Sequence, residues 1–135
     1  MSGIIVSDLD QLIRFAFDGF VGGIPVLPHE KVESVRRTLA LSPSAFFDMF
    51  ARRVAHEYDL EELSFEVADC AMNSLSGYCL SQYDVDLPSF AKEVYFAFDQ
   101  GEFRHQGDHD AIDPEAKYTR PRIRSLVVRD QILGA

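Results

Sequence analysis

Apolar residues recur every three or four positions along most of the chain, the spacing that lines up one face of an α-helix. The pattern is longest between residues 60 and 81. Its apolar side consists of Leu60, Leu63, Val67, Ala71, Leu75 and Tyr78. A narrow polar stripe and several small residues run beside it, which is typical of a helix packed closely among others. We expect this helix to lie at the centre of a helical bundle.

Start and stop residues mark further helices with the same periodicity. They are predicted over about 7–22, 29–39, 42–56 and 86–101. The clearest start is Ser42 followed by Pro43, because serine caps a helix and proline costs no hydrogen bond at the first helical position. Residues 102–115 are polar and acidic and are expected to form a long loop.

The last segment, residues 120–133, is compatible with two structures. Pro121 and the apolar residues after it favour a helix, whereas Ser125–Arg129 also fits a short strand that would pair with Gly3–Val6. We therefore predict an all-α fold, a compact bundle of about five to six helices in a single domain over 1–135. A minor two-stranded pairing of the termini is the alternative.

Composition narrows the class of protein. The chain has 135 residues, of which 47% are hydrophobic, and a formal net charge of −9. This charge argues against binding to nucleic acid or to anionic membranes, since both require a basic surface. No apolar run reaches the roughly 20 residues that span a bilayer, and no basic N-terminal region indicates a targeting signal. Cys70 and Cys79 are too far apart on one helix for a disulfide, which favours a reducing, cytoplasmic location.

Charge is distributed unevenly along the chain. Residues 54–91 contain no lysine or arginine. In this region we expect one acidic helix face, formed by Glu57, Asp59, Glu61, Glu62, Glu66 and Asp69. Residues 1–113 carry a net charge of −12, whereas residues 114–135 carry +3. Two interpretations follow from this distribution. In one, the basic tail docks on the acidic face, within one chain or across a homodimer. In the other, the acidic face binds a basic partner protein.

The leading functional hypothesis is a small cytoplasmic protein-binding module that presents the acidic face to a basic partner. An immunity protein or antitoxin that neutralises a basic toxin, or an adaptor, would fit this size and charge. No nucleophile elbow, phosphate-binding loop or dinucleotide fingerprint occurs in the sequence, so no catalytic residue is assigned and an enzyme is disfavoured. A structural homodimer without a ligand is one alternative.

The other alternative is a metal-binding helical protein or enzyme that uses the 102–110 loop. Its candidate ligands for a divalent metal are Glu102, His105, Asp108 and His109. Imidazole and carboxylate groups are ligands that zinc and related ions take. Glu102 and His105 supply one E-x-x-H spacing, but a di-iron bundle needs two, so the motif is incomplete. No other cofactor is expected.

Overall fold

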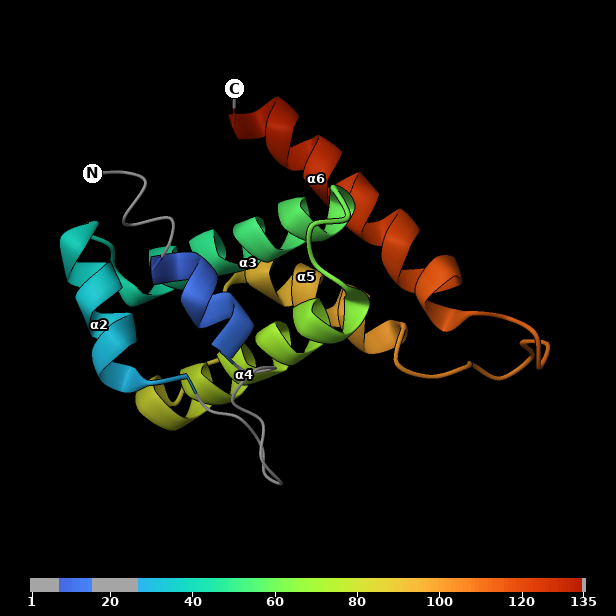
Figure 1. Cartoon of the computed structure of the whole chain (residues 1–135), viewed down its shortest axis with the longest axis horizontal. Coiled ribbons are helices and arrows are strands. Elements are labelled where there is room, and N and C mark those ends of the chain that lie inside the picture. Colours follow the sequence, from blue (N-terminus) through green and yellow to red (C-terminus); the bar gives the residue numbers. More distant parts are fainter. Residues whose placement is uncertain (1–7, 16–26, 135) are drawn as a thin grey trace.

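The computed structural model describes residues 8–15 and 27–134, and these residues form an all-α bundle without strands, which confirms the predicted fold class. A helical segment occupies residues 8–15, and the predicted end of this first helix lies outside the described residues. The labelled elements are α2 (His29–Thr38), α3 (Pro43–Asp59), α4 (Phe65–Tyr83), α5 (Ser89–Gln100), the π-helical turn η1 (Glu115–Thr119) and α6 (Arg120–Gly134). The loop over residues 101–113 projects from the bundle (Figure 1).

Helices α3, α4 and α5 form the middle of a core to which the 8–15 segment, α2 and α6 also contribute buried side chains. α3 packs against α4, α5 and α6, and α5 packs against α4, α6 and η1. The helix expected at the centre, α4, contacts both α3 and α5 and buries small side chains such as Ala68 and Ala71. α3 contributes the large aromatic groups, since Phe46, Phe47 and Phe50 are each at most 2% exposed. Close packing of small against large side chains therefore holds the three helices together.

Capping residues set the helix starts. At α3 the Ser42 hydroxyl accepts a hydrogen bond from the Ala45 N–H at 3.2 Å, as the sequence signal predicts. The predicted start of the fourth helix at Leu60 is wrong, because Ser64 is the N-cap of α4 and accepts from a first-turn N–H at 3.2 Å. Residues 60–63 form a turn instead, in which Leu60 is 66% exposed.

The C-terminal segment is a helix throughout its described part. α6 buries Ile123, Leu126 and Val127, whose spacing places them on one helical face toward the bundle. The strand alternative for Ser125–Arg129 is therefore wrong, and the proposed pairing of the termini fails with it. The other half of that pairing, Gly3–Val6, lies outside the described residues.

Aromatic rings fill the junction of α3, α4 and α5. The fully buried Phe98 ring lies 5.0 Å from the Tyr58 ring and 6.0 Å from the Phe65 ring, measured between centroids. Aromatic pairs of this kind contribute about 0.5–1.5 kcal/mol beyond the area that they bury. They fix the end of α5 against the start of α4.

We expect Phe98→Ala to lower the free energy of unfolding by about 3–5 kcal/mol, because it opens a cavity that the surrounding helices cannot fully close. Phe96→Ala is the matched control on the same helix, since Phe96 is 51% exposed. Phe96→Ala should lower the free energy of unfolding by less than about 1 kcal/mol. Urea denaturation of both variants measures the difference, and equal losses would contradict the assignment of Phe98 to the core.

Gly101 allows the end of α5 to approach η1. The Thr119 hydroxyl, which is buried in η1, donates a hydrogen bond to the Ala97 carbonyl at 2.7 Å. A Cβ atom at position 101 would overlap this hydroxyl. The missing side chain at residue 101 is therefore what lets the hydrogen bond form.

We expect Gly101→Ala to lower the midpoint of thermal unfolding, because its methyl group would displace Thr119 and leave a buried hydroxyl without its acceptor. Gly77→Ala provides the control. A Cβ at Gly77 in α4 meets nothing within 4 Å, so alanine should stabilise the helix by about 0.5–1 kcal/mol. Opposite shifts of the two midpoints are the expected result, and shifts in the same direction would refute the packing described for Gly101.

Candidate functional site

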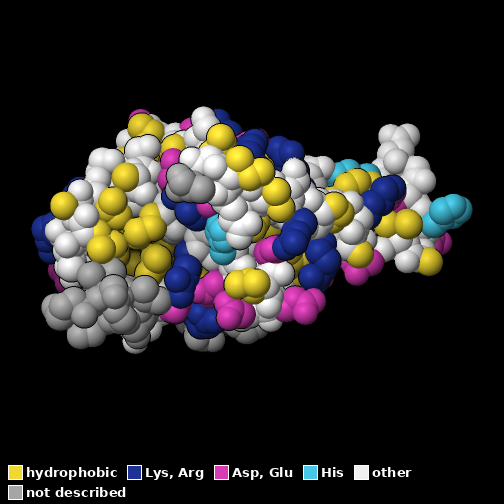
Figure 2. All heavy atoms as spheres, turned by 90° about the horizontal axis from the view of Figure 1, so that it is seen from above, with side chains coloured by type: hydrophobic (Ala, Val, Ile, Leu, Met, Phe, Trp, Pro, Cys, Tyr) yellow, Lys and Arg dark blue, Asp and Glu magenta, His cyan; other side chains and the backbone are white. Residues whose placement is uncertain are grey.

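The six predicted acidic residues do not form one free face. Arg124 of α6 donates to the Asp59 carboxylate at 2.7 Å, and Arg120 lies 3.6 Å from the Glu61 carboxylate. The basic tail therefore docks on acids of its own chain. Glu62, in the same turn as Glu61, is exposed. Seen from the side of α6, basic and acidic side chains are interspersed rather than separated (Figure 2).

Glu57 is enclosed by charges that join the 8–15 segment to α3. Its side chain forms an ion pair with Arg53, and its other oxygen lies 3.6 Å from Arg14, too far for a hydrogen bond. Burial, followed by the neighbouring Asp10 carboxyl, raises the pKa of Glu57, although Arg53 opposes the shift. This carboxyl is only 6% exposed and is therefore not accessible to a partner protein.

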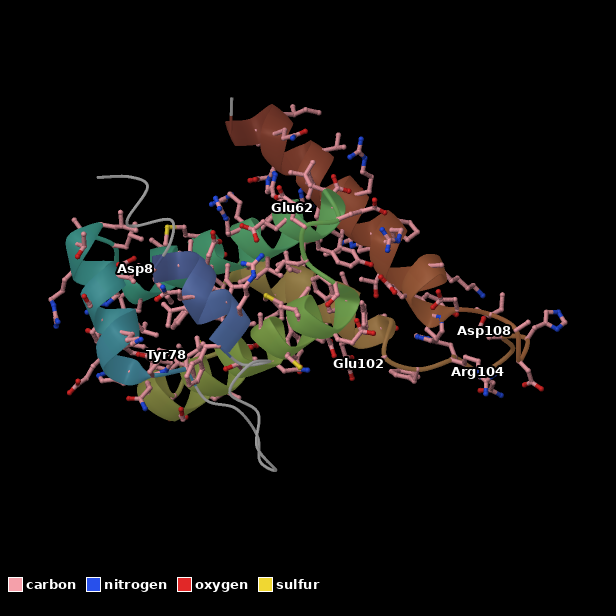
Figure 3. The ribbon with its side chains drawn as sticks, in the orientation of Figure 1. Asp8, Glu62, Tyr78, Glu102, Arg104 and Asp108 are labelled. Atoms are coloured by element: carbon pink, nitrogen blue, oxygen red, sulfur yellow. The ribbon has the colours of Figure 1, made fainter. Side chains whose placement is uncertain are left out.

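Of the last two predicted residues, Glu66 and Asp69, the second lies beside carboxyl groups from another element. The Asp69 carboxyl lies beside Glu102, and Asp99 and Glu66 are close enough to act on its charge. The Glu102 carboxylate also accepts a hydrogen bond from the Asn73 amide at 3.3 Å, which places it against α4 (Figure 3). We call Glu66, Asp69, Asp99 and Glu102 the acidic cluster.

No described basic side chain compensates the acidic cluster. None of its four carboxyl groups forms an ion pair within the part of the chain that the structure describes. Burial, and then the hydrogen bond and charge of Glu102, raise the pKa of Asp69 to about 8, so this carboxyl is largely protonated at neutral pH. Where carboxyl groups share a proton, a cation that replaces the proton gains favourable electrostatic interactions with all of them.

Aromatic side chains border the acidic cluster. Burial, followed by the charges of Asp99 and Glu102, raises the pKa of Tyr95, which shows that this ring lies near them. Phe103 follows Glu102 in the chain and is 50% exposed. Burial and the nearby carboxylates also raise the pKa of the Cys70 thiol, so it stays protonated and is not activated as a nucleophile. The arrangement suits a cationic group that is attached to an apolar one.

Two members of the acidic cluster were not expected there. Asp99 belongs to no predicted site, and Glu102 is predicted only as a metal ligand. Helical periodicity misses both because α4 and the end of α5 meet only in three dimensions. The usable signal is Gly101, which ends α5 between the two acids.

Asp108, one of the four predicted metal ligands, is engaged within the projecting loop. Its carboxylate forms an ion pair with Lys117 and accepts hydrogen bonds from the Tyr118 hydroxyl at 2.7 Å and the His105 N–H at 2.9 Å. These partners, Lys117 first among them, hold the pKa of Asp108 well below its usual range. The carboxylate therefore ties the loop to η1.

The other predicted metal ligands lie apart from Asp108. Glu102 belongs to the acidic cluster, and His109 is exposed. The His105 Nε2 atom lies 2.9 Å from the Gln100 carbonyl oxygen, to which it donates when it carries the proton. Among residues 8–15 and 27–134 no group of three or more His, Cys, Asp or Glu side chains is placed to hold a metal ion. The structure does not bring the four predicted ligands together.

The raised pKa of Asp69 links stability to pH. Above pH 3.8 the Asp69 carboxyl loses its proton in the unfolded chain, whereas in the folded chain it keeps the proton until about pH 8. The stability that Asp69 contributes is therefore complete below pH 3.8 and is lost as the pH rises toward 8. We expect Asp69→Asn to gain stability relative to the wild type between about pH 5 and pH 8. Urea midpoints at both pH values measure this gain, with Glu62→Gln as the exposed control. Parallel pH profiles for wild type and Asp69→Asn would contradict the raised pKa.

The described helices differ from membrane-spanning ones, because none of them is both long and apolar enough to cross a bilayer. The acidic cluster is the place where the structure gathers titratable groups without neutralising them. No family model matches the chain, and no curated protein or solved structure matches it either.

Proposed function

We propose that the protein is a small protein-binding module that engages a basic partner through the acidic cluster. The observation that carries this proposal is the set of carboxyl groups around Asp69, which act on its charge and form no ion pair with a described residue. Most of the other described carboxylates do form one, for example Asp59 with Arg124 and Glu93 with Arg129. Asp8, Glu62 and Asp84 also lack an ion pair with a described residue, and the acidic cluster differs from them because its carboxyl groups together raise the pKa of one member, Asp69.

A bound cation would relieve the repulsion within the acidic cluster. A lysine or arginine of a partner would replace the proton shared by Asp69 and Glu102 and form charge-assisted hydrogen bonds with both. Single exposed ion pairs contribute only about 0–1 kcal/mol, so a specific complex needs several of them and an apolar contact as well. The Phe103 ring, which follows Glu102 in the chain and stacks on His105, is 50% exposed and offers an apolar surface for that contact.

The proposal narrows the hypothesis drawn from the sequence. Glu57 and Asp59 are already engaged by arginines of their own chain and are not proposed as partner-binding residues. Glu66 and Asp69 are retained, and Asp99 and Glu102 join them. The binding surface thus moves from a single run of sequence to the contact between α4 and the end of α5.

The biological setting that we propose is cytoplasmic. Cys70 and Cys79 are both free thiols, which is the state that reducing compartments maintain. An inhibitor of the immunity or antitoxin type and an adaptor both remain within this proposal. A homodimer held by the basic tail has less support, because Arg120 and Arg124 meet acids of their own chain.

We expect the triple substitution Glu66→Gln, Asp99→Asn and Glu102→Gln to weaken the binding of a basic peptide at least tenfold. The probe is hexalysine, titrated into ¹⁵N-labelled protein at low ionic strength, where charges are least screened. In the wild type the largest amide shifts should fall on the first turn of α4 and on residues 99–103.

The matched control for this experiment is the triple substitution Asp8→Asn, Glu30→Gln and Asp84→Asn. It removes the same charge from exposed positions outside the acidic cluster. We expect less than a twofold change in affinity from this variant. If both triple variants lose affinity equally, the peptide responds to net charge alone and the proposed site is wrong.

A further inference from the structure

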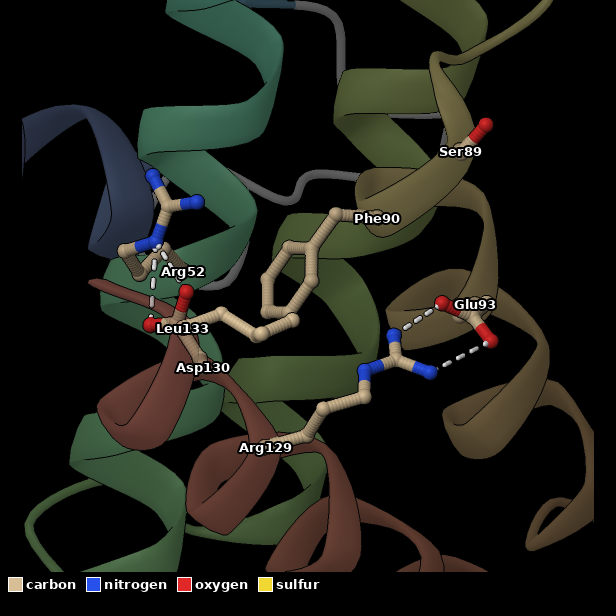
Figure 4. Close-up of a pocket in the computed structure, with 7 residues that line it drawn as sticks. All are labelled: Arg52, Ser89, Phe90, Glu93, Arg129, Asp130 and Leu133. Carbon is tan, nitrogen blue, oxygen red and sulfur yellow. Dashed lines mark hydrogen bonds and ion pairs between the residues drawn. The ribbon is translucent and has the colours of Figure 1, made fainter.

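A pocket of about 460 Å³ lies between α3, α5 and α6, at the end of α5 opposite to the acidic cluster. This volume is within the range of about 300–1,000 Å³ that is usual for sites of small ligands. Its apolar wall includes the Phe90 ring and Leu133, whose side chain is 78% exposed (Figure 4). Ser89 and four charged side chains complete the lining, the charged ones being Arg52, Glu93, Arg129 and Asp130.

In this pocket Asp130 holds the Arg52 guanidinium on its Nε side. Its Nε donates to the two oxygens of Asp130 at 2.8 and 3.0 Å, and Asp130 also lies 2.9 Å from the His56 Nε2 atom. The guanidinium carbon lies 5.1 Å from the centre of the Phe90 ring. Neither Nη atom of Arg52 has an acceptor among the described residues (Figure 4). The side chain therefore presents its two Nη amino groups, both open, next to an aromatic ring.

The other charges of the pocket satisfy one another. Arg129 forms an ion pair with Glu93, and Arg122 donates to the same carboxylate at 3.0 Å. Burial acts against ionisation of Asp130, but the hydrogen bonds from His56 and Arg52 prevail and lower its pKa. Both carboxylates of the pocket are thus ionised and paired, Arg129 directs both of its Nη atoms at Glu93, and among the described residues Arg52 keeps both of its Nη atoms open.

We propose that this pocket binds a carboxylate carried on an apolar group, from either a small carboxylic acid or the C-terminus of a peptide. The carboxylate would accept hydrogen bonds from both Nη atoms of Arg52. The apolar group would lie against Phe90 and Leu133. The site shares no residue with the acidic cluster, so it does not depend on the function proposed above.

The chemistry of the pocket favours a carboxylate over a phosphate. The planar fork of a guanidinium matches the two oxygens of a carboxylate in spacing and direction. One open guanidinium also suits a single negative charge. A phosphate dianion would bring more negative charge close to Glu93 and Asp130, which repel it.

The test is a titration of the full-length ¹⁵N-labelled protein with 3-phenylpropionate and with N-acetyl-alanyl-phenylalanine. We expect saturable shifts at the amides of Phe90 and Leu133, and at least tenfold weaker binding of the corresponding amides, 3-phenylpropionamide and the peptide amide. Tighter binding of the peptide would identify a chain terminus as the natural ligand, and tighter binding of 3-phenylpropionate would identify a small acid. No saturable shift, or equal affinity for acid and amide, would overturn the proposal.

Variants of Arg52 separate ligand binding from stability. Arg52→Gln should weaken 3-phenylpropionate binding at least tenfold, whereas Arg37→Gln, which removes the same charge from an exposed position on α2, should leave it unchanged. Arg52→Lys retains an ion pair with Asp130 but lacks the two-pronged donor, so it should show an intermediate loss even if Arg52→Gln folds poorly. Wild-type affinity in the folded Arg52→Lys variant would refute the role of the guanidinium.

Discussion

The docking of α6 on α3 and α5 is the interaction on which the rest of the structure depends. Apolar burial of Ile123, Leu126 and Val127 drives it, and the Thr119 hydrogen bond to the Ala97 carbonyl fixes its position. At about 1.5–3 kcal/mol per fully buried aliphatic side chain, these three residues outweigh the ion pairs at the rim of the contact. The arginines of α6 are therefore placed by the apolar contact and neutralise whichever acids lie opposite.

This placement determines which acids remain uncompensated. Arg124 pairs with Asp59 at the end of α3, and Arg120 pairs with Glu61 just after it. Neither arginine forms an ion pair with the acids at the start of α4. The acidic cluster is thus among the described acids that the arginines of α6 do not pair. The same docking forms the pocket lined by Arg52, because α6 closes its third side. One packing event therefore produces both surfaces that we propose to bind ligands.

The sequence predicts the helices well because helical periodicity and capping are local properties. Ser42 with Pro43 marks the start of α3 correctly, whereas Leu60 is misassigned because Ser64 is the stronger cap and the turn before it closes α3. The strand alternative at the C-terminus fails because the apolar residues of α6 share one helical face, which covers an apolar surface of the bundle.

The candidate site was harder to predict because it depends on contacts between elements. Uneven charge along the chain indicates an acidic surface, but only the fold separates Glu57, which is enclosed near Arg53, from Asp69, which meets Glu102. Residues thirty positions apart in sequence cannot be grouped by periodicity within one helix. The apparent metal motif was misleading for the same reason, since Glu102 and Asp108 are close in sequence but have separate partners.

Among the described residues the acidic cluster has no cation of its own, and titration of the Asp69 side-chain carboxyl carbon by ¹³C NMR tests this directly. A midpoint of about 8 is expected in the free protein. The midpoint should fall when a basic peptide is bound, because a nearby cation favours the ionised carboxylate. A midpoint near the ordinary value of 3.8 in the free protein would show that the charges are already compensated, and would contradict this account.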